Sequence, residues 1–87
     1  MMPLDYAHRW SQIALVELLK IEPGWCSGDE LAWDVFKSRE VIRGRTRAVL
    51  RQLAADGVLQ RFDVRHRGGI MECYLLDHDA IRPYIHE

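Results

Sequence analysis

The hydrophobic pattern of the chain changes its period at Gly57. Before this glycine, apolar side chains recur every three or four residues, as on one face of a helix; after it, two β-rich runs, 58–64 and 70–76, flank residues 65–69. In the left-handed conformation, Gly57 would let Val58 fold back on Leu53. The pattern predicts a helix that stops at Gly57 and a β-hairpin after it. The inward side of that helix holds Ile42, Thr46, Val49, Leu50 and Leu53.

Two helices are expected before this one. Residues 5–21 have helical spacing, and Pro23 and Gly24 close the segment. Ser27 and Glu30 have the Ser-x-x-Glu spacing of a capping box, in which the serine hydroxyl accepts a backbone N–H at the start of a helix. A second helix should therefore begin there and end near residues 37–38. Its apolar face would hold Leu31, Ala32, Val35 and Phe36.

The hairpin and the tail complete the expected architecture. Alternation along the second strand places Met71, Cys73 and Leu75 on one face, which we expect to cover the helices, while Glu72 and Tyr74 point outward. Asp77 could cap one further helical turn through Ile81, and Pro83 limits its length. The fold class predicted is mainly α with a β-hairpin: three helices followed by two strands.

The length of 87 residues suits one compact domain, 1–87, with a core in 5–76 and a tail in 77–87. The longest apolar run, Ile13 to Val16, is far shorter than the roughly 20 residues that span a membrane. We also see no secretory signal, so a cytoplasmic location is expected. Cys26 and Cys73 lack metal-ligand spacing, so we expect core or half-buried cysteines and no cofactor.

Charge is strongly polarised along the chain despite a formal net charge of -1. Residues 37–67 hold nine basic and three acidic side chains, or +6, whereas the rest of the chain carries -7. A polarised field steers charged partners better than the net charge suggests, so one face should favour a polyanion. Arginines on a helix are often only a solvated surface, and a GC-rich genome could supply them. Eight of the ten arginines nevertheless lie between positions 39 and 67.

The order helix, helix, helix, Gly, hairpin, with "DELA" opening the second helix and "RAVLRQLAADGVL" closing the third, resembles the winged helix-turn-helix family of bacterial and phage regulators. The resemblance covers about residues 5–76 and is most specific at the Leu50-x-x-Leu53 pair followed by Gly57-Val58-Leu59. It implies that the third helix enters the major groove of DNA and that the hairpin, or wing, touches the backbone or minor groove.

The geometry of the third helix agrees with that role. With its apolar stripe inward, Gly44, Arg47, Ala48, Arg51 and Ala55 point outward, and Arg43 and Arg45 flank opposite edges. Small residues between arginines would let the helix approach another surface closely, and arginine can contact phosphate or guanine. Gly68 and Gly69 would supply the hairpin turn. The candidate DNA-binding residues are Arg39, Arg43, Arg45, Arg47, Arg51, Arg65, His66 and Arg67.

The function expected is sequence-selective binding of double-stranded DNA by a small transcriptional regulator. Arg47 and Arg51 would read bases, and the other arginines would neutralise phosphates. A homodimer is expected, because one small domain buries little DNA. The alternative is a protein-interaction module, an adaptor or inhibitor, on the same scaffold. No motif of an enzyme is visible. The dimer surface expected is the first helix plus the tail, through Leu15, Leu19, Ile81, Tyr84 and Ile85.

Overall fold

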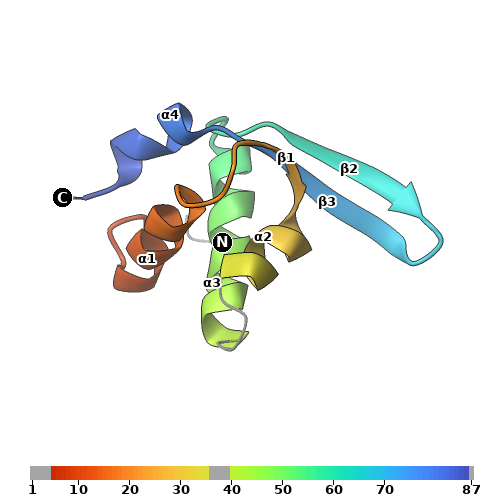
Figure 1. Cartoon of the computed structure of the whole chain (residues 1–87), viewed down its shortest axis with the longest axis horizontal. Helices are drawn as coiled ribbons and strands as arrows, with labels where there is room; N and C mark the ends of the chain where they lie inside the picture. Colours follow the sequence, from red (N-terminus) through yellow and green to blue (C-terminus); the bar gives the residue numbers. More distant parts are fainter. Residues whose placement is uncertain (1–4, 36–39, 87) are drawn as a thin grey trace.

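The computed structural model describes residues 5–35 and 40–86, of which 34, 35 and 40–42 are described by their backbone alone. This part of the chain forms four α-helices, one short 3-10 helix and three strands (Figure 1). In chain order they are α1 (Arg9–Leu18), β1 (Gly24–Ser27), α2 (Gly28–Val35), α3 (Glu40–Ala55), β2 (Arg61–His66), β3 (Gly69–Leu76), α4 (His78–Ile81) and η1 (Arg82–Tyr84).

The strands form one antiparallel sheet in the order β1-β3-β2. The predicted hairpin is present as β2 and β3, which extend together away from the helices (Figure 1). The short strand β1 was not predicted, and it makes the sheet three-stranded. It pairs with the end of β3, from Gly24 opposite Leu76 to Ser27 opposite Cys73. Sequence reasoning missed it because four residues between a Pro-Gly turn and a helix cap are too few to show alternation.

The predicted starts of α2 and α4 and the predicted end of α3 are formed by the residues expected to form them, whereas α1 is shorter than expected. The Glu30 N–H donates to Ser27 Oγ at 3.1 Å, as in a capping box. The helix expected over 5–21 spans only Arg9–Leu18, because His8 Nδ1 caps its start and the chain tightens into turns after Leu18. The end of α2 expected near residues 37–38 lies outside the described residues, as does Phe36.

The end of α3 follows the prediction closely. Gly57 has φ +78°, and the Val58 N–H donates to the Leu53 carbonyl at 2.8 Å. Of the predicted inward positions, Thr46, Val49, Leu50 and Leu53 are fully buried, while the side chain of Ile42 lies outside the description. The N–H groups of Val58 and Leu59 donate to the Leu53 carbonyl at this helix end, and β2 begins at Arg61 rather than at Val58.

The predicted facing of β3 is wrong. Tyr74 and Leu76 are each only 1% exposed and join the core, whereas Met71 is 36% exposed. The tyrosine ring fits against the start of α2, since a Cβ atom at Gly28 would lie 3.2 Å from Tyr74 Cε2. The strand therefore turns Glu72 and Tyr74 toward the helices, and Met71, Cys73 and Leu75 away from them.

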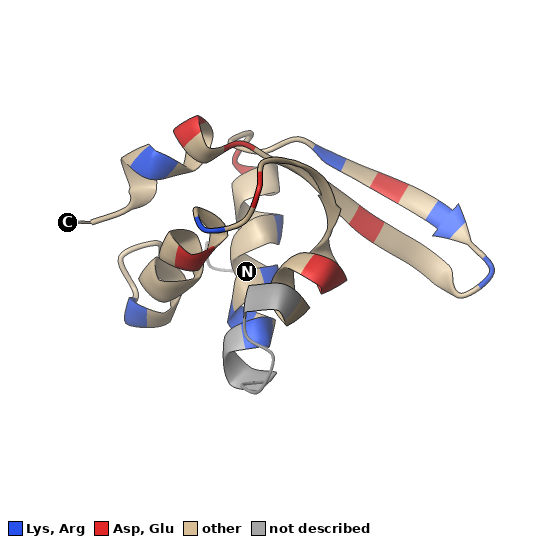
Figure 2. Cartoon of the chain, viewed as in Figure 1, with Lys and Arg blue, Asp and Glu red and all other residues tan. Residues whose placement is uncertain are grey.

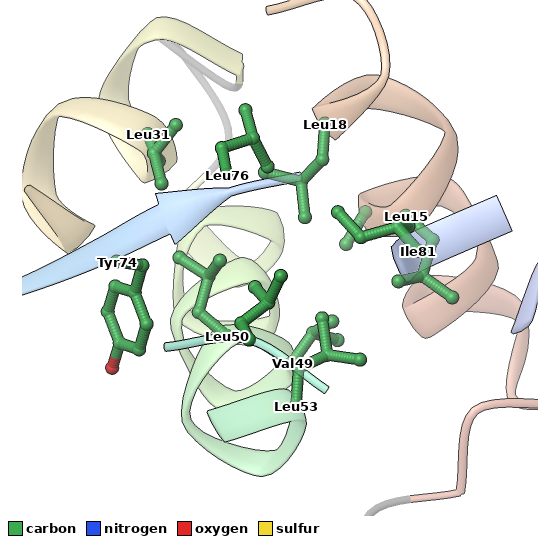
Figure 3. Packing of buried hydrophobic residues seen from close by; sticks show 11 residues of the cluster. Leu15, Leu18, Leu31, Val49, Leu50, Leu53, Tyr74, Leu76 and Ile81 are labelled. Atoms are coloured by element: carbon green, nitrogen blue, oxygen red, sulfur yellow. The ribbon is translucent and has the colours of Figure 1, made fainter. Parts of the chain in front are cut away.

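The core joins side chains from α1, α2, α3, β3 and α4 in one cluster. Figure 3 shows Val49 and Leu53 of α3 beside Leu15 of α1 and Ile81 of α4. Cys26 and Cys73 are half-buried, as expected. Within the described ranges, the helices are all too short or too polar to cross a membrane.

The tail packs on its own chain, so Leu15 and Ile81 of the expected dimer surface are not accessible to a second copy. Asp77 caps α4 as predicted, and Ile81 and Leu15 are fully buried in the core of one chain. The Gln12 side chain holds the tail to α1, donating to the Tyr84 carbonyl at 2.9 Å and accepting from the His86 N–H at 2.8 Å. The other apolar residues of that predicted surface, Leu19, Tyr84 and Ile85, are packed against the same core.

Candidate functional site

The first half of α3 presents basic side chains, of which Arg43 and Arg47, one turn apart, form a row beside Gly44. Arg43, Arg45 and Arg47 are all partly exposed, and Gly44 between them is exposed. Arg47 and Gly44 point away from the buried stripe of Thr46, Val49, Leu50 and Leu53, whereas Arg43 and Arg45 lie at its two edges, as predicted. Figure 2 shows the basic positions along α3 and at the hairpin tip, and acidic positions on α2 and within the hairpin.

Gly44 has no structural role that the described chain reveals. A Cβ atom built there meets nothing within 4 Å, and the residue does not have a positive φ. Glycine within a helix costs about 0.5–1 kcal/mol relative to alanine. Packing in this chain therefore does not explain the glycine, and its position leaves the helix backbone open to close approach from outside.

Trp33 of α2 lies beside this row, and sequence reasoning left it out of the site. It is 54% exposed, and the guanidinium carbon of Arg43 lies 4.6 Å from its ring centroid. A cation over an exposed tryptophan ring gains about 0.5–1 kcal/mol. The signal was present in the sequence, because Trp33 lies off the apolar face of its helix. Packing is the commoner role of a tryptophan at the edge of a helix, so the sequence alone does not assign it to the site.

A hollow of about 560 Å³ lies between α2 and α3 at this point. It brings the acidic start of α2 next to the basic start of α3. Arg47 crosses it, with Nη1 at 2.9 Å from Asp29 Oδ1. Both side chains are well exposed, so the pair contributes about 0–1 kcal/mol and can be exchanged for another anion. The hollow is lined by Asp29, Glu30, Ala32, Trp33, Arg43, Gly44 and Arg47.

Arg51, predicted to read bases, is engaged with the hairpin. Its Nε lies 3.0 Å from Glu72 Oε2 and its Nη2 lies 3.0 Å from Glu72 Oε1, which makes a forked pair. The Tyr74 hydroxyl donates to Glu72 Oε2 at 2.9 Å. Arg61 Nη2 lies 3.5 Å from Glu72 Oε1. One carboxylate thus joins α3 to both strands of the hairpin.

These contacts shift the pKa values of the cluster. The hydrogen bonds from Arg51 are the largest cause that holds the pKa of Glu72 below its ordinary value of 4.5, and the Tyr74 hydroxyl acts in the same direction. Burial, followed by the hydrogen bond to Glu72, raises the pKa of Tyr74 to about 12. Glu72 is therefore ionised and Tyr74 neutral near neutral pH, as the geometry of the cluster requires.

The hairpin tip carries the other predicted residues. His66 pairs with Gly69, so the turn residues are Arg67 and Gly68 rather than the Gly68 and Gly69 expected. His66 Nδ1 accepts the Gly68 N–H at 3.0 Å, which gives this ring a role in closing the turn. Arg65 and Arg67 are exposed. No ion pair holds either of them within the described part of the chain.

The structure thus gathers the predicted site residues in three places. Arg43, Arg45 and Arg47 share the first half of α3, Arg51 joins the carboxylate cluster, and Arg65, His66 and Arg67 lie at the hairpin tip. Arg39 lies outside the described residues. Comparison with known proteins returns no match to a protein family, a curated protein or a solved structure.

Proposed function

We propose that this chain binds double-stranded DNA as a small transcriptional regulator of the winged helix-turn-helix type. In this proposal α3 enters the major groove and the β2–β3 hairpin is the wing. The order α1, β1, α2, α3, β2, β3, with β3 between the other two strands, supports it. The observation that carries it is the exposed row on α3, in which arginines flank a glycine that the described packing does not require.

The α3 row suits a polyanion with closely spaced charges. Gly44 would let the helix backbone approach the groove, and Arg43 and Arg47 lie on either side of it in the same hollow. Their present partners are weakly bound, since Arg47 is in an exposed ion pair and Arg43 is stacked on an exposed ring. Phosphates can replace Asp29 at Arg47 with little loss of stability.

The hairpin adds a second contact in this proposal. Arg65 and Arg67 are exposed at a tip that extends beyond the helices (Figure 1), where they would meet phosphates or a minor groove. Arg39, Arg45 and His66 remain predicted members of the surface. Arg51 also remains a predicted base contact, but it would first have to exchange its hydrogen bonds to Glu72 for bonds to a base.

Fluorescence anisotropy of a labelled random duplex tests the proposal. We expect wild-type affinity to fall by orders of magnitude between about 50 and 200 mM salt, because counterions compete for the phosphates. The Arg43→Ala, Arg47→Ala double variant should bind about tenfold or more weakly, with a shallower salt dependence. Absence of binding by the wild type at about 50 mM salt would overturn the proposal.

The Arg9→Ala, Arg82→Ala double variant is the matched control. It removes the same charge from α1 and η1, where Arg9 stacks on Trp10 and Arg82 pairs with Asp79. Its affinity for DNA should stay within about twofold of the wild type, apart from the long-range effect of net charge. Equal losses in the two double variants would mean that bulk charge, and not the α3 row, attracts the duplex.

The alternative, a protein-interaction module, differs in its response to salt. An interface that mixes apolar and charged contacts weakens far less with salt than a phosphate contact surface does. A wild type that does not bind the duplex but binds an acidic protein with a shallow salt dependence would favour the module.

A further inference from the structure

The face of the sheet that points away from the helices is mostly apolar, with Ser27 and His66 as its polar residues. In the observed register Trp25 lies opposite Leu75, Phe62 opposite Cys73 and Val64 opposite Met71. Residues directly opposite in an antiparallel pair share one face, and alternate residues along a strand share it too. We call this set the outer stripe: Trp25, Phe62, Val64, Met71, Cys73 and Leu75.

The outer stripe is open to solvent in the single chain. Trp25 is 55% exposed and Phe62 is 61% exposed, values that are high for large aromatic side chains in a sheet. Met71 continues the exposed surface toward the hairpin tip. The largest contiguous apolar patch of a small protein, of the order of a few hundred Å², often has a function.

Charge is arranged opposite to the usual pattern of a sheet with one covered face. Arg61, Asp63 and Glu72 lie on the helix side, in the cluster with Arg51. On the outer side, the described strand residues include no Asp, Glu, Lys or Arg. An antiparallel sheet with one solvated face normally places charged side chains toward water. The inversion indicates that something apolar covers the outer stripe.

The size of the stripe fits a modest dimer interface. Taking roughly 150–250 Å² for a large side chain, the exposed fractions of Trp25, Phe62 and Met71 leave roughly 300 Å² per copy. Two copies would bury about 600 Å² from these residues, with more from Val64, Cys73 and Leu75. A specific interface of about 1,200 Å², of which about 60% is apolar, needs about 700 Å² of apolar surface.

We propose that the outer stripe is the interface through which two copies of this chain pair. A face without charge offers nothing to a charged partner, whereas a two-fold axis lays the same apolar residues against each other. The proposal places the dimer contact on the sheet instead of on α1 and the tail, because the apolar residues of α1 and the tail pack against the core of their own chain. It does not depend on DNA binding, because pairing is measured without nucleic acid.

Sedimentation equilibrium of the full chain tests the pairing. We expect the wild type to approach twice the chain mass of 10.2 kDa at concentrations of tens of micromolar, as about 1,200 Å² of interface allows. Pairing should persist at about 1 M salt, because apolar burial does not weaken with screening. A wild type that stays at the monomer mass at all concentrations would overturn the proposal and assign the stripe to a different partner.

Lysine substitutions locate the interface. Phe62→Lys should raise the dissociation constant by about 100-fold or more, because it brings like charges into a desolvated surface. Ile70→Lys is the matched control, since Ile70 is also 61% exposed but lies on the other face of the hairpin. It should leave the dissociation constant unchanged. Pairing that survives Phe62→Lys, or that Ile70→Lys abolishes equally, contradicts the assignment.

The fold of each variant is checked by circular dichroism and thermal unfolding. Where Phe62→Lys fails to fold, Met71→Lys replaces it, because that side chain is exposed on the same face near the hairpin tip. Met71→Lys should weaken pairing by about tenfold or more, as expected for a charge nearer the edge of the buried surface. A folded Met71→Lys variant that pairs as the wild type does would equally overturn the proposal.

Discussion

Arg51 of α3 and Glu72 of β3 hold the hairpin to the helix through a forked ion pair, with N–O distances of 3.0 Å for both prongs. The two residues are 21 positions apart in the sequence. Because the Tyr74 hydroxyl and Arg61 also reach the same carboxylate, one side chain sets how the hairpin leaves the body of the protein.

The first prediction concerns the pH dependence of this pair. Since the folded-state pKa of Glu72 lies below its ordinary value of 4.5, its contribution to stability is present above that pH. It is lost as the pH falls through the folded-state pKa. Glu72→Gln should therefore lower the free energy of unfolding by about 1 kcal/mol or less at neutral pH. Urea unfolding should show this difference disappearing in acid.

Asp79→Asn is the control for this titration. Asp79 pairs with Arg82 at 2.7 Å, but its side chain is 88% exposed, so screening leaves the pair almost without effect. Its unfolding free energy should match the wild type at every pH tested. If the difference in unfolding free energy between Glu72→Gln and the wild type instead grew as the pH falls, the ion pair with Arg51 would not be its source.

The second prediction concerns alkaline pH. The folded-state pKa of Tyr74, about 12, exceeds its ordinary value of 10.0, so its contribution is complete below pH 10 and is lost as the pH rises toward 12. Tyr74→Phe should cost about 0.5–1.5 kcal/mol at neutral pH, because the bond to Glu72 is lost. The variant should then lose less stability than the wild type between pH 10 and 12, as measured by unfolding monitored through tyrosinate absorbance and circular dichroism.

Tyr6 needs a parallel variant in that experiment. Burial, and then the hydrogen bond that its hydroxyl donates to Asp56 Oδ2 at 2.7 Å, also raises the pKa of Tyr6. Tyr6→Phe should also reduce the loss of stability at alkaline pH, by an amount that belongs to Tyr6 and not to Tyr74. If Tyr74→Phe leaves the alkaline unfolding curve unchanged, Tyr74 does not hold the stated position beside Glu72.

The third prediction contrasts two glycines. Gly57→Ala should lower the free energy of unfolding by about 1–2 kcal/mol, because φ is +78° there. Gly44→Ala should raise the free energy of unfolding by about 0.5–1 kcal/mol, because alanine favours a helix more than glycine does and its methyl group would meet no other atom. Urea midpoints measure both. Equal signs for the two substitutions would contradict the assigned backbone conformations.

Gly44→Ala also bears on the proposed function. If α3 approaches a DNA groove at Gly44, the added methyl group should weaken DNA binding while the protein becomes more stable. The same anisotropy assay measures the effect. Unchanged or tighter binding by the stabilised variant would remove Gly44 from the contact surface.

The fourth prediction concerns the tail. Ile81→Ala should cost about 2–5 kcal/mol, because Ile81 is fully buried against the core. Ile85→Ala should cost less, since that side chain is only partly buried. Thermal unfolding measures both, and Ile81→Val, expected to cost about 0.5–1.5 kcal/mol, replaces a variant that fails to fold. A cost at Ile81 no greater than at Ile85 would contradict the packing of α4.

Local signals in the sequence predicted the helix boundaries better than the sheet. Ser27, Gly57 and Asp77 mark ends through backbone contacts within a few residues, and the structure confirms each of them. The four-residue β1 has no such signal. It forms because β3 provides an edge that lies about 50 positions away in the sequence.

The facing of β3 shows a second limit. Alternation identifies which residues share a face, but it does not say which face is covered. The apolar set Met71, Cys73 and Leu75 was assigned to the core, and the structure instead buries Tyr74 and Leu76. The error also hid the contact between Arg51 and Glu72, because both side chains were expected to point outward.

The projecting hairpin has a consequence for local unfolding. Residues 65–70 are exposed on both faces, so the free energy that keeps the tip ordered comes mainly from hydrogen bonds between its two strands. Amide protons at the tip should therefore exchange with solvent through small openings that leave the helices intact. Any partner that covers the tip closes those openings, which makes amide exchange at the tip a direct report of where that partner sits.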